Sequence, residues 1–383
     1  MWLVPALRFP EFTEEWKNTT LKNECSINPT SDKLKDEFVY VDLESVEKGE
    51  LIKKQVIEKE NAPSRAQRVL RNGDVLFQCV RPYQRNNYLV KNVSSEVQWV
   101  ASTGYAQLRT ERNNPAFIYH LLNTSSFNKK VIVRCTGSSY PAINSDDLSK
   151  IHFYICGDIE EQKRIADFLT LLDERIATQN KIIEDLKKLK SAIADKLYSS
   201  TKGETYSFRQ LFDVINERNK KLTYSNVLSA SQELGMIERS DINKDIKFEQ
   251  DSISGYKIVR NGDYVVHLRS FQGGFAFSDR TGICSPAYTI LHPNDLVAYG
   301  YLSHFFISKP FIKSLKLVTY GIRDGRSINV DEWLDMTVTL PTKREQSHIL
   351  AIINAIDNKL HNENQIHNYM FRQRTYLLKT MFI

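Results

Sequence analysis

The sequence predicts an α+β protein with an internal pseudo-twofold repeat, in which two α/β globular domains are separated by two long antiparallel coiled-coil helices. Three observations lead to this prediction. Short motifs recur in the same order in both halves, each half closes with a long apolar stripe of helical period, and each half holds short apolar runs typical of strands. The predicted globular domains are residues 1–157 and 201–341, and the predicted helices are residues 158–200 and 342–383.

The repeat rests on a collinear series of short matches. The tetrapeptide Arg-Asn-Gly-Asp occurs at 71–74 and again at 260–263, each time before an apolar run. The separation between copies drifts only from 189 to 184 residues along the chain, which a few insertions explain. One such match could arise by chance, whereas an ordered series indicates a duplication. The further matches are 143–144 with 328–329, 161–162 with 345–346, and 172–173 with 356–357.

The two helical segments carry apolar residues at alternating steps of four and three, the spacing of coiled coils. Each stripe covers roughly 33 residues, or about 50 Å of helix, which is long for an ordinary buried helix face. The polar interruptions Gln179 and Lys190 recur as Glu363 and Arg374. Pairing of Gln179 or Lys190 with Glu363 is one hypothesis for what sets the helix register. The predicted interface residues are Ile165, Leu169, Leu172, Ile176, Ile183, Leu186, Ile193, Ile349, Ile353, Ile356, Leu360, Met370 and Leu377.

The globular domains combine strand and helix patterns. In the first, a helix is predicted at Phe117–Leu122, and in the second near Leu296–Phe306. The predicted strands are 38–41, 74–79, 97–100 and 105–108 in the first domain, and 263–268, 288–291 and 336–340 in the second.

Composition is that of a globular protein, with 41% hydrophobic and 26% charged residues among 383. The five cysteines form no Cys-x-x-Cys pair, and the histidines do not cluster, so we expect neither a disulfide framework nor a metal site. The N-terminus lacks the features of a signal peptide, and no stretch approaches the roughly 20 apolar residues of a membrane span. We therefore expect a cytoplasmic protein without a membrane partner.

No residue is predicted to be catalytic. Adenine methyltransferases hold the flipped base with an Asn/Asp/Ser-Pro-Pro-aromatic loop, and the nearest matches, 114–117 and 285–288, lack the second proline. Acidic and lysine residues that could suit a nuclease, such as 160–163 and 184–188, fall on the amphipathic helix, where charges normally face solvent. The chain also lacks a Walker A phosphate loop.

Binding of DNA accounts better for two pairs of polar loops. The loops after the apolar runs, 81–87 and 267–274, combine Arg with Asn or Gln, and these side chains can each bond a base edge in two places. The glycine turns at 134–140 and 319–326 offer amides, hydroxyls and arginines for phosphate, although plain solvated loops remain the alternative. The predicted DNA-binding residues are Arg81, Tyr83, Gln84, Arg85, Asn86, Arg134, Ser138, Ser139, Tyr140, His267, Arg269, Ser270, Gln272, Tyr320, Arg323 and Arg326.

Several of these stretches carry a family resemblance. The opening Val4–Phe12 with Trp16, the strand entry Asn72–Phe77, and both junctions into the long helices are similar to those of specificity (S) subunits of Type I restriction-modification enzymes. The resemblance covers essentially the whole chain. The sequence departs from the family at two positions. Tyr264 stands where the family usually has an aliphatic residue. His367 interrupts the second apolar stripe, which predicts looser packing toward the far end of the second helix.

The resemblance implies two target-recognition domains that each read one half of a bipartite double-stranded DNA site. It also implies that the helices separate these domains and dock two modification subunits, which carry S-adenosylmethionine and methylate adenine. Restriction subunits, the motor-nucleases, would join and cleave unmodified DNA, so ATP and Mg are likewise expected on partner subunits and none in this chain.

Two other functions remain open from the sequence. A coiled-coil scaffold could hold protein partners without sequence-specific DNA binding, and a stand-alone methyltransferase would need motifs that are missing here. Because major-groove readers on one face of DNA lie about 34 Å apart per turn, helices of about 50 Å accommodate one turn between half-sites. The divergence of the two loops predicts two different half-sites.

Overall fold

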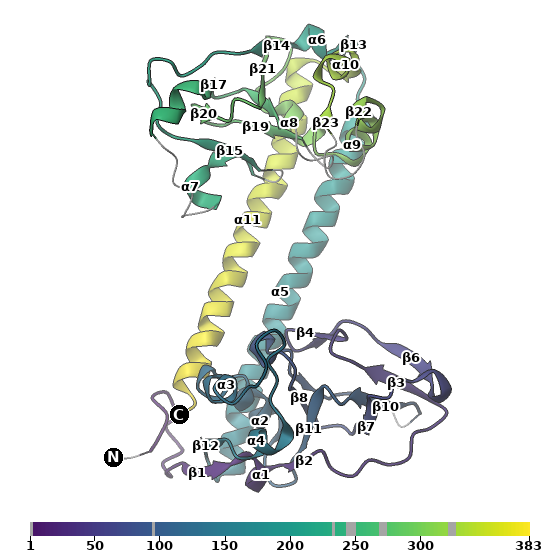
Figure 1. Ribbon diagram of the computed structural model, residues 1–383, viewed down its shortest axis with the longest axis vertical. Helices are drawn as coiled ribbons and strands as arrows, with labels where there is room; N and C mark the ends of the chain where they lie inside the picture. Colours follow the sequence, from purple (N-terminus) through teal and green to yellow (C-terminus); the bar gives the residue numbers. More distant parts are fainter. Residues whose placement is uncertain (1–2, 94–95, 232–233, 243–249, 268–273, 321–326) are drawn as a thin grey trace. The chain divides into compact units, whose positions relative to one another are not determined.

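The computed structural model describes residues 3–93, 96–231, 234–242, 250–267, 274–320 and 327–383 (Figure 1). The chain divides into two compact units, one made of residues 1–180 with 365–383 and the other of residues 181–364. Helices α5 (Ile159–Ser199) and α11 (Lys343–Thr380) each contribute a segment to both units. Each unit also holds a module of short strands and helices, which confirms the predicted α+β class with an internal repeat.

The first module contains two sheets, with strand orders β6-β3-β10-β7 and β2-β11-β8-β9 within the described residues. Its strands are β1 (Lys17–Thr20), β2 (Ser26–Ile27), β3 (Glu37–Val41), β4 (Val46–Glu47), β5 (Glu50–Leu51), β6 (Gln55–Glu58), β7 (Ala66–Val69), β8 (Val75–Gln78), β9 (Tyr88–Leu89), β10 (Gln98–Ser102), β11 (Tyr105–Arg109) and β12 (His152–Ile155). Its helices are α1 (Leu21–Glu24), α2 (Pro115–Leu122), α3 (Ser125–Ile132) and α4 (Ser145–Ser149), with 3-10 turns at Lys59–Asn61 and Pro82–Gln84.

The second module repeats part of this arrangement within the described residues. Its sheet β14-β21-β18-β19 has the same order as β2-β11-β8-β9, and the pair β13-β24 corresponds to β1-β12. Its strands are β13 (Glu204–Ser207), β14 (Phe212–Ile215), β15 (Leu228–Ser231), β16 (Gly235–Glu238), β17 (Lys257–Val259), β18 (Tyr264–Val266), β19 (Phe275–Phe277), β20 (Gly282–Cys284), β21 (Thr289–Pro293), β22 (Thr319–Tyr320), β23 (Ser327–Ile328) and β24 (Thr337–Leu340). Its helices are α6 (Phe208–Leu211), α7 (Arg239–Ile242), α8 (Tyr301–Phe305), α9 (Lys309–Ser314) and α10 (Val330–Asp335), with 3-10 turns at Gln250–Gly255 and Leu315–Val318.

Most predicted elements of the modules are present. The four strands predicted in the first module correspond to β3, β8, β10 and β11, and the helix predicted there corresponds to α2. The helix predicted near Leu296–Phe306 is wrong in length, because α8 covers only Tyr301–Phe305. Gly300 adopts a left-handed backbone, with φ at 75°, and the chain before it turns rather than winding into a helix. The predicted strand 263–268 is found as β18, and Leu268 lies outside the described residues.

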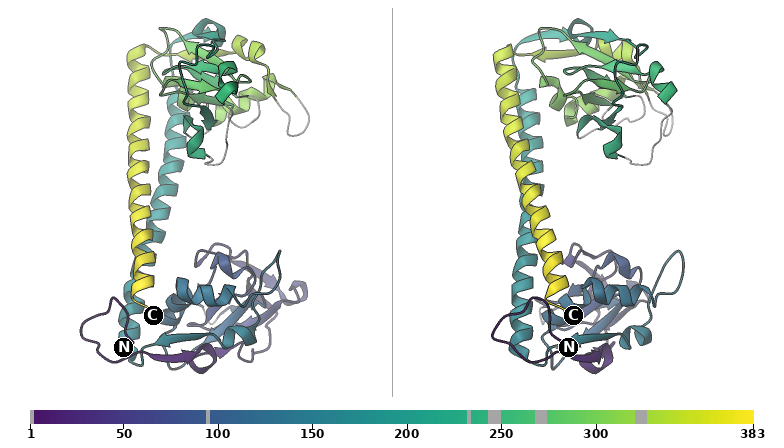
Figure 2. Two further views of the ribbon diagram at one scale, coloured as in Figure 1. Left: turned by 60° about the vertical axis from the view of Figure 1, so that its left-hand side comes forward. Right: turned by 90° about the vertical axis from the view of Figure 1, so that its left-hand side faces the viewer.

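The two long helices run side by side in opposite directions within each unit (Figures 1 and 2). The predicted stripe residues are buried or half-buried along both helices, with Leu169 and Ile353 among the most deeply buried. Lys190 forms an ion pair with Asp357, at 2.6 Å, so the pairing of Lys190 with Glu363 is wrong. The alternative pairing of Gln179 with Glu363 stays a prediction. In the other unit Arg374 pairs with Asp173. The structure therefore pairs the polar position of one stripe with an aspartate on the opposite helix in both units.

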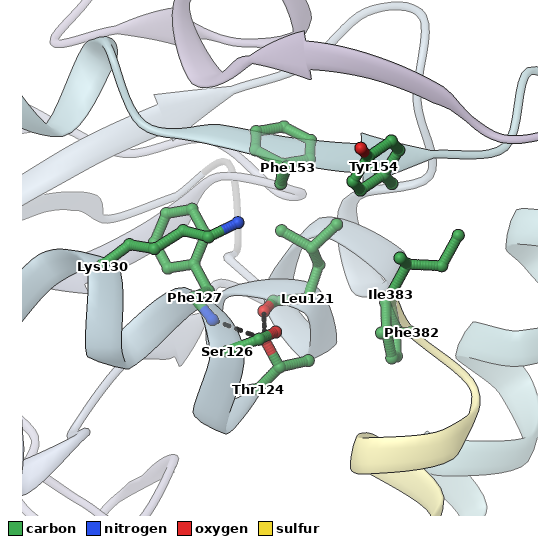
Figure 3. A pocket seen from close by; sticks show the side chains of 9 residues that line it. All are labelled: Leu121, Thr124, Ser126, Phe127, Lys130, Phe153, Tyr154, Phe382 and Ile383. Atoms are coloured by element: carbon green, nitrogen blue, oxygen red, sulfur yellow. Dashed lines mark hydrogen bonds between the residues drawn. The ribbon is translucent and has the colours of Figure 1, made fainter. Parts of the chain in front are cut away.

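Both chain termini complete the core of the first unit. Arg8 holds the buried carboxylate of Glu161 with two hydrogen bonds, at 2.6 and 2.7 Å. Phe382 packs on Phe117, with ring centroids 5.2 Å apart. Phe382 and Ile383 also line a small pocket together with residues of the first module (Figure 3). Leu377 and Met381 are also buried, so the looser packing predicted for the end of α11 is not found.

One glutamine in each copy of the repeat joins its module to a long helix. Gln162 is 1% exposed, donates to the Cys156 carbonyl at 2.9 Å and accepts from the Asn114 N–H at 2.8 Å. Gln346 makes the equivalent bonds, to the Pro341 carbonyl at 3.0 Å and from the Ala298 N–H at 2.7 Å. These bonds explain in physical terms why Glu-Gln recurs at both junctions. No helix among the described residues combines the length and apolarity needed to cross a membrane.

We predict that Gln162→Leu lowers the free energy of unfolding by about 2–5 kcal/mol, because it strands two backbone groups that the glutamine now satisfies. Chemical denaturation monitored by circular dichroism would measure the loss. The neighbouring exposed Lys163→Leu is the control and should change the stability by less than about 0.5 kcal/mol. A loss that small for Gln162→Leu would contradict the role assigned to this residue.

Candidate nucleic-acid interface

The two loops predicted to bind DNA in the first module come together in space. Val80, two residues after β8, forms a β-bridge with Ala142, which is also bridged to Thr136. The Arg81 N–H donates to the Pro141 carbonyl at 2.8 Å, which fastens the loop after β8 to the glycine turn. Loop 81–87 and turn 134–140 thus form one continuous surface, here called the paired-loop surface.

An arginine and a tyrosine from different loops stack at the centre of the paired-loop surface. The guanidinium carbon of Arg81 lies 4.5 Å from the ring centroid of Tyr140, a cation–π contact. Tyr140 is 64% exposed and Tyr83 is 53% exposed, an unusual exposure for large aromatic side chains. Gln84, Arg134, Ser138 and Ser139 are exposed as well. The surface therefore presents a planar cation, aromatic rings and several hydrogen-bonding groups to solvent.

The backbone of this loop is held in an unfavourable conformation. Arg81 and Arg85 flank the 3-10 turn Pro82–Gln84, with left-handed φ values of 54° and 55°. Non-glycine residues adopt this region rarely and at a cost, so other contacts must enforce it. The buried side chain of Gln78 supplies them: its Nε2 donates to Gln84 at 2.8 Å and its Oε1 accepts from the Asn86 N–H at 3.0 Å.

Two further predicted DNA-binding residues of this loop, Asn86 and Arg85, also have contacts within the protein. Asn86 accepts from the Lys48 N–H at 3.0 Å, which engages its amide oxygen. Arg85 is half-buried, and its pKa is lowered first by burial and then by the nearby guanidinium of Arg374 on α11. Arg85 therefore lies close to the long helix, unlike the exposed Gln84.

Only part of the corresponding surface in the second module is described. His267, at the end of β18, is half-buried, and its N–H donates to the Gly274 carbonyl at 2.7 Å. Tyr320 belongs to β22, whose backbone pairs with β23. The other predicted positions, Arg269, Ser270, Gln272, Arg323 and Arg326, lie outside the described residues.

The repeated Arg-Asn-Gly-Asp turns position the strands that lead to these loops. Asp74 accepts from the Arg71 N–H and forms an ion pair with Arg109, at 2.7 Å in each case. Asp263 likewise accepts from the Arg260 N–H at 2.7 Å. Each turn contains a glycine with φ near 90° and leads directly into β8 or β18. The motif is thus a structural frame, as its recurrence indicates.

Sequence reasoning missed Gln78 and Asn87, which support the loop from beneath. Asn87 is 2% exposed, accepts from the Gln78 N–H and donates to Asn123 at the end of α2. The available signal was a polar residue at the end of an otherwise apolar strand, since a buried amide must find partners there. Among the residues that the structure describes, no three His, Cys, Asp or Glu side chains gather in a way that could hold a metal ion.

Comparison with known proteins relates this geometry to a family. Residues 14–188 match the model of the Type I restriction modification DNA specificity domain. The chain is 25% identical over 168 residues to the specificity subunit of the Type I restriction enzyme HindI from Haemophilus influenzae, which is 43% of this chain and about a third (33%) of that relative.

Two solved structures share the fold over nearly the whole chain. The S subunit of a Type I restriction-modification system from M. genitalium has 14% identity and a TM-score of 0.58, with 99% of each chain covered. A chain from a study of complex assembly and conformational transition in the type I R-M system has 20% identity and a TM-score of 0.61, covering 96% of this chain and 97% of that one. The resemblance to specificity subunits of Type I restriction-modification enzymes is confirmed for residues 14–188, which match the DNA specificity domain of that family. Over the rest of the chain the solved structures show a shared fold.

Proposed function

We propose that this chain is a non-catalytic subunit that recognises a bipartite, asymmetric DNA site within a Type I restriction-modification complex. The observation that carries the proposal is the stacked Arg81–Tyr140 pair, at 4.5 Å, on the exposed paired-loop surface. Arg81 can bond the edge of a guanine in two places, and the exposed hydroxyls and Arg134 can bond phosphate. This surface lies within the residues that match the DNA specificity domain.

The second module supports an asymmetric site. Its sheet has the strand order of the first module, while the loop after β18 differs in sequence from the loop after β8. Because the two modules share a sheet order, their loops would approach DNA in the same orientation. Because the loops differ in sequence, they would offer different side chains to the bases. Each module would therefore read its own half-site.

The partners of the chain follow from the same proposal. Two modification subunits would dock on it, carrying S-adenosylmethionine for adenine methylation, and restriction subunits would bring ATP and Mg for cleavage. The proposed location is the cytoplasm, where the DNA to be modified or cleaved is found. The alternative is a coiled-coil scaffold without sequence-specific binding, which the long helices alone would also suit.

A gel shift with random-sequence competitor DNA separates the proposal from this alternative. The probe comes from mapping methylated adenines in the host genome with and without the chain, which also yields both half-sites and their spacing. The proposal expects a complex that survives excess random competitor and methylation marks that vanish without the chain. Equal competition by every sequence, or unchanged methylation, would support the scaffold.

Replacing Arg81 by alanine should relax base preference at one position of one half-site, by about 1–3 kcal/mol of lost discrimination. Arg134→Ala is the matched control, because Arg134 is exposed on the same surface and is expected to bind phosphate. That variant should weaken binding to all sequences alike. Selection of bound sequences from a random DNA pool measures both effects, and a uniform loss for Arg81→Ala would reassign Arg81 as a phosphate anchor.

Binding should also weaken steeply with salt, since each neutralised phosphate releases condensed counterions. The logarithm of the binding constant should fall linearly with the logarithm of salt concentration, with a slope of about −0.9 per phosphate contact. Removing Arg134 should reduce this slope by about one contact. A slope near zero would argue against DNA as the ligand.

A further inference from the structure

A polar cluster ties the first module to both long helices. His120 of α2 places its Nε2 3.1 Å from the Thr170 hydroxyl of α5, and its Nδ1 lies 3.9 Å from the carboxylate of Asp173. Arg374 of α11 pairs with the same carboxylate, with its Nη2 at 3.1 Å. Three helices therefore meet at Asp173.

The second unit contains the same cluster with the long helices exchanged. His304 of α8 places its Nε2 3.7 Å from Asp357 of α11, and Asn354 provides a side-chain hydrogen bond to this histidine. Lys190 of α5 pairs with Asp357 at 2.6 Å. His304, Asn354 and Asp357 each lie 184 residues after their counterparts in the first cluster, and Arg374 lies 184 residues after Lys190. These two groups are here called the helix clamps.

The histidines of the helix clamps are not needed to fill the space between the helices, because apolar side chains could do so. His120 is 1% exposed, and burial lowers its pKa to about 4, so the imidazole is neutral near pH 7. The pKa of His304 is lowered as well, first by burial and then by Lys190. The Nδ1 atoms of both histidines are buried without a hydrogen bond in the described part of the chain, a cost of about 1–3 kcal/mol each. An apolar residue would avoid that cost in either module.

Each clamp lies beside an element that leads toward a recognition loop. In the first module, Asn123 caps the end of α2, three residues after His120, and its side chain bonds Asn87 at 3.1 Å. Asn87 in turn accepts from the backbone of Gln78, which holds loop 81–87. In the second module, the Leu302 N–H of α8 donates to the buried hydroxyl of Tyr264, at 3.1 Å. This bond also explains why Tyr264 departs from the aliphatic residue usual in the family.

We propose that the helix clamps, His120–Asp173–Arg374 and His304–Asp357–Lys190, are positioning devices. They hold α2, with the loop that it supports, and α8, with strand β18, at a set orientation on the helix pair. The proposal rests on the proposed function, because it concerns how the loops are presented to DNA. The residues of a clamp act through α2 or α8 and need not touch the DNA. Each clamp serves its own module, so damage to one should affect one half-site.

The test is selection of bound sequences from a random DNA pool, using the full chain assembled with its modification subunits. Asp173→Arg sets like charges against Arg374, and Asp357→Lys does the same against Lys190. The expected result is a loss of about tenfold in base preference at one half-site for Asp173→Arg. Asp357→Lys should cause the same loss at the other half-site and spare the first.

Charge exchange provides the rescue. Asp173→Arg combined with Arg374→Asp, and Asp357→Lys combined with Lys190→Asp, should restore most of the lost preference. Asp167→Arg, on an exposed position of the same helix α5, is the control and should leave both half-sites unchanged. If thermal unfolding shows that a charge-reversed variant does not fold, Asp173→Asn and Asp357→Asn replace it, with smaller losses expected at the same half-sites.

Three outcomes would overturn the proposal: equal losses at both half-sites, no loss at either, or no recovery on charge exchange. Failure of the proposed function is distinguishable, because the unmodified complex would then select no sequence at all. A variant that only lowers the unfolding temperature, without a change in base preference, would show that the clamps are structural and do not position the loops.

Discussion

The architecture depends on one constraint: an amphipathic helix this long is stable only when its apolar stripe is covered along its whole length. Helix α5 has 41 residues and α11 has 38, and in each unit a segment of one lies beside a segment of the other. The polar interruptions of the stripes are then a liability unless they are paired. Two of these interruptions are paired across the helices, Lys190 with Asp357 in one unit and Arg374 with Asp173 in the other.

Duplication explains why the same solution appears in both units. The sheet order, the Asp-centred turns and the glutamines at the helix junctions are shared, because each satisfies buried backbone groups that both modules have. Loops that satisfy no such shared requirement are free to diverge. In the first module, two arginine residues adopt left-handed backbone conformations, and hydrogen bonds from Gln78 hold the loop between them. This arrangement serves to present the loop side chains to a ligand more than to stabilise the fold.

A surface of this kind gains from being rigid, since a ligand then meets side chains that are already ordered. Arg81 is stacked on Tyr140 and tied by its backbone to Pro141 before any partner arrives. Arg85, by contrast, is half-buried near Arg374, so neighbouring residues of one loop face different surroundings. The loop therefore joins a solvent-facing side to a side that adjoins the long helix.

The sequence by itself determined the repeat, the long helices, most strands and the positions of the candidate loops. These features are local, because the spacing of apolar residues, the residue types at turns and the order of motifs can each be read from residues close together in the sequence. Only the tertiary structure decided that loop 81–87 meets turn 134–140, that Lys190 pairs with Asp357 in place of Glu363, and that His120 and His304 occupy equivalent clusters. Such pairings join residues far apart in the chain, and their choice depends on how helices and sheets pack, which side-chain type alone does not specify.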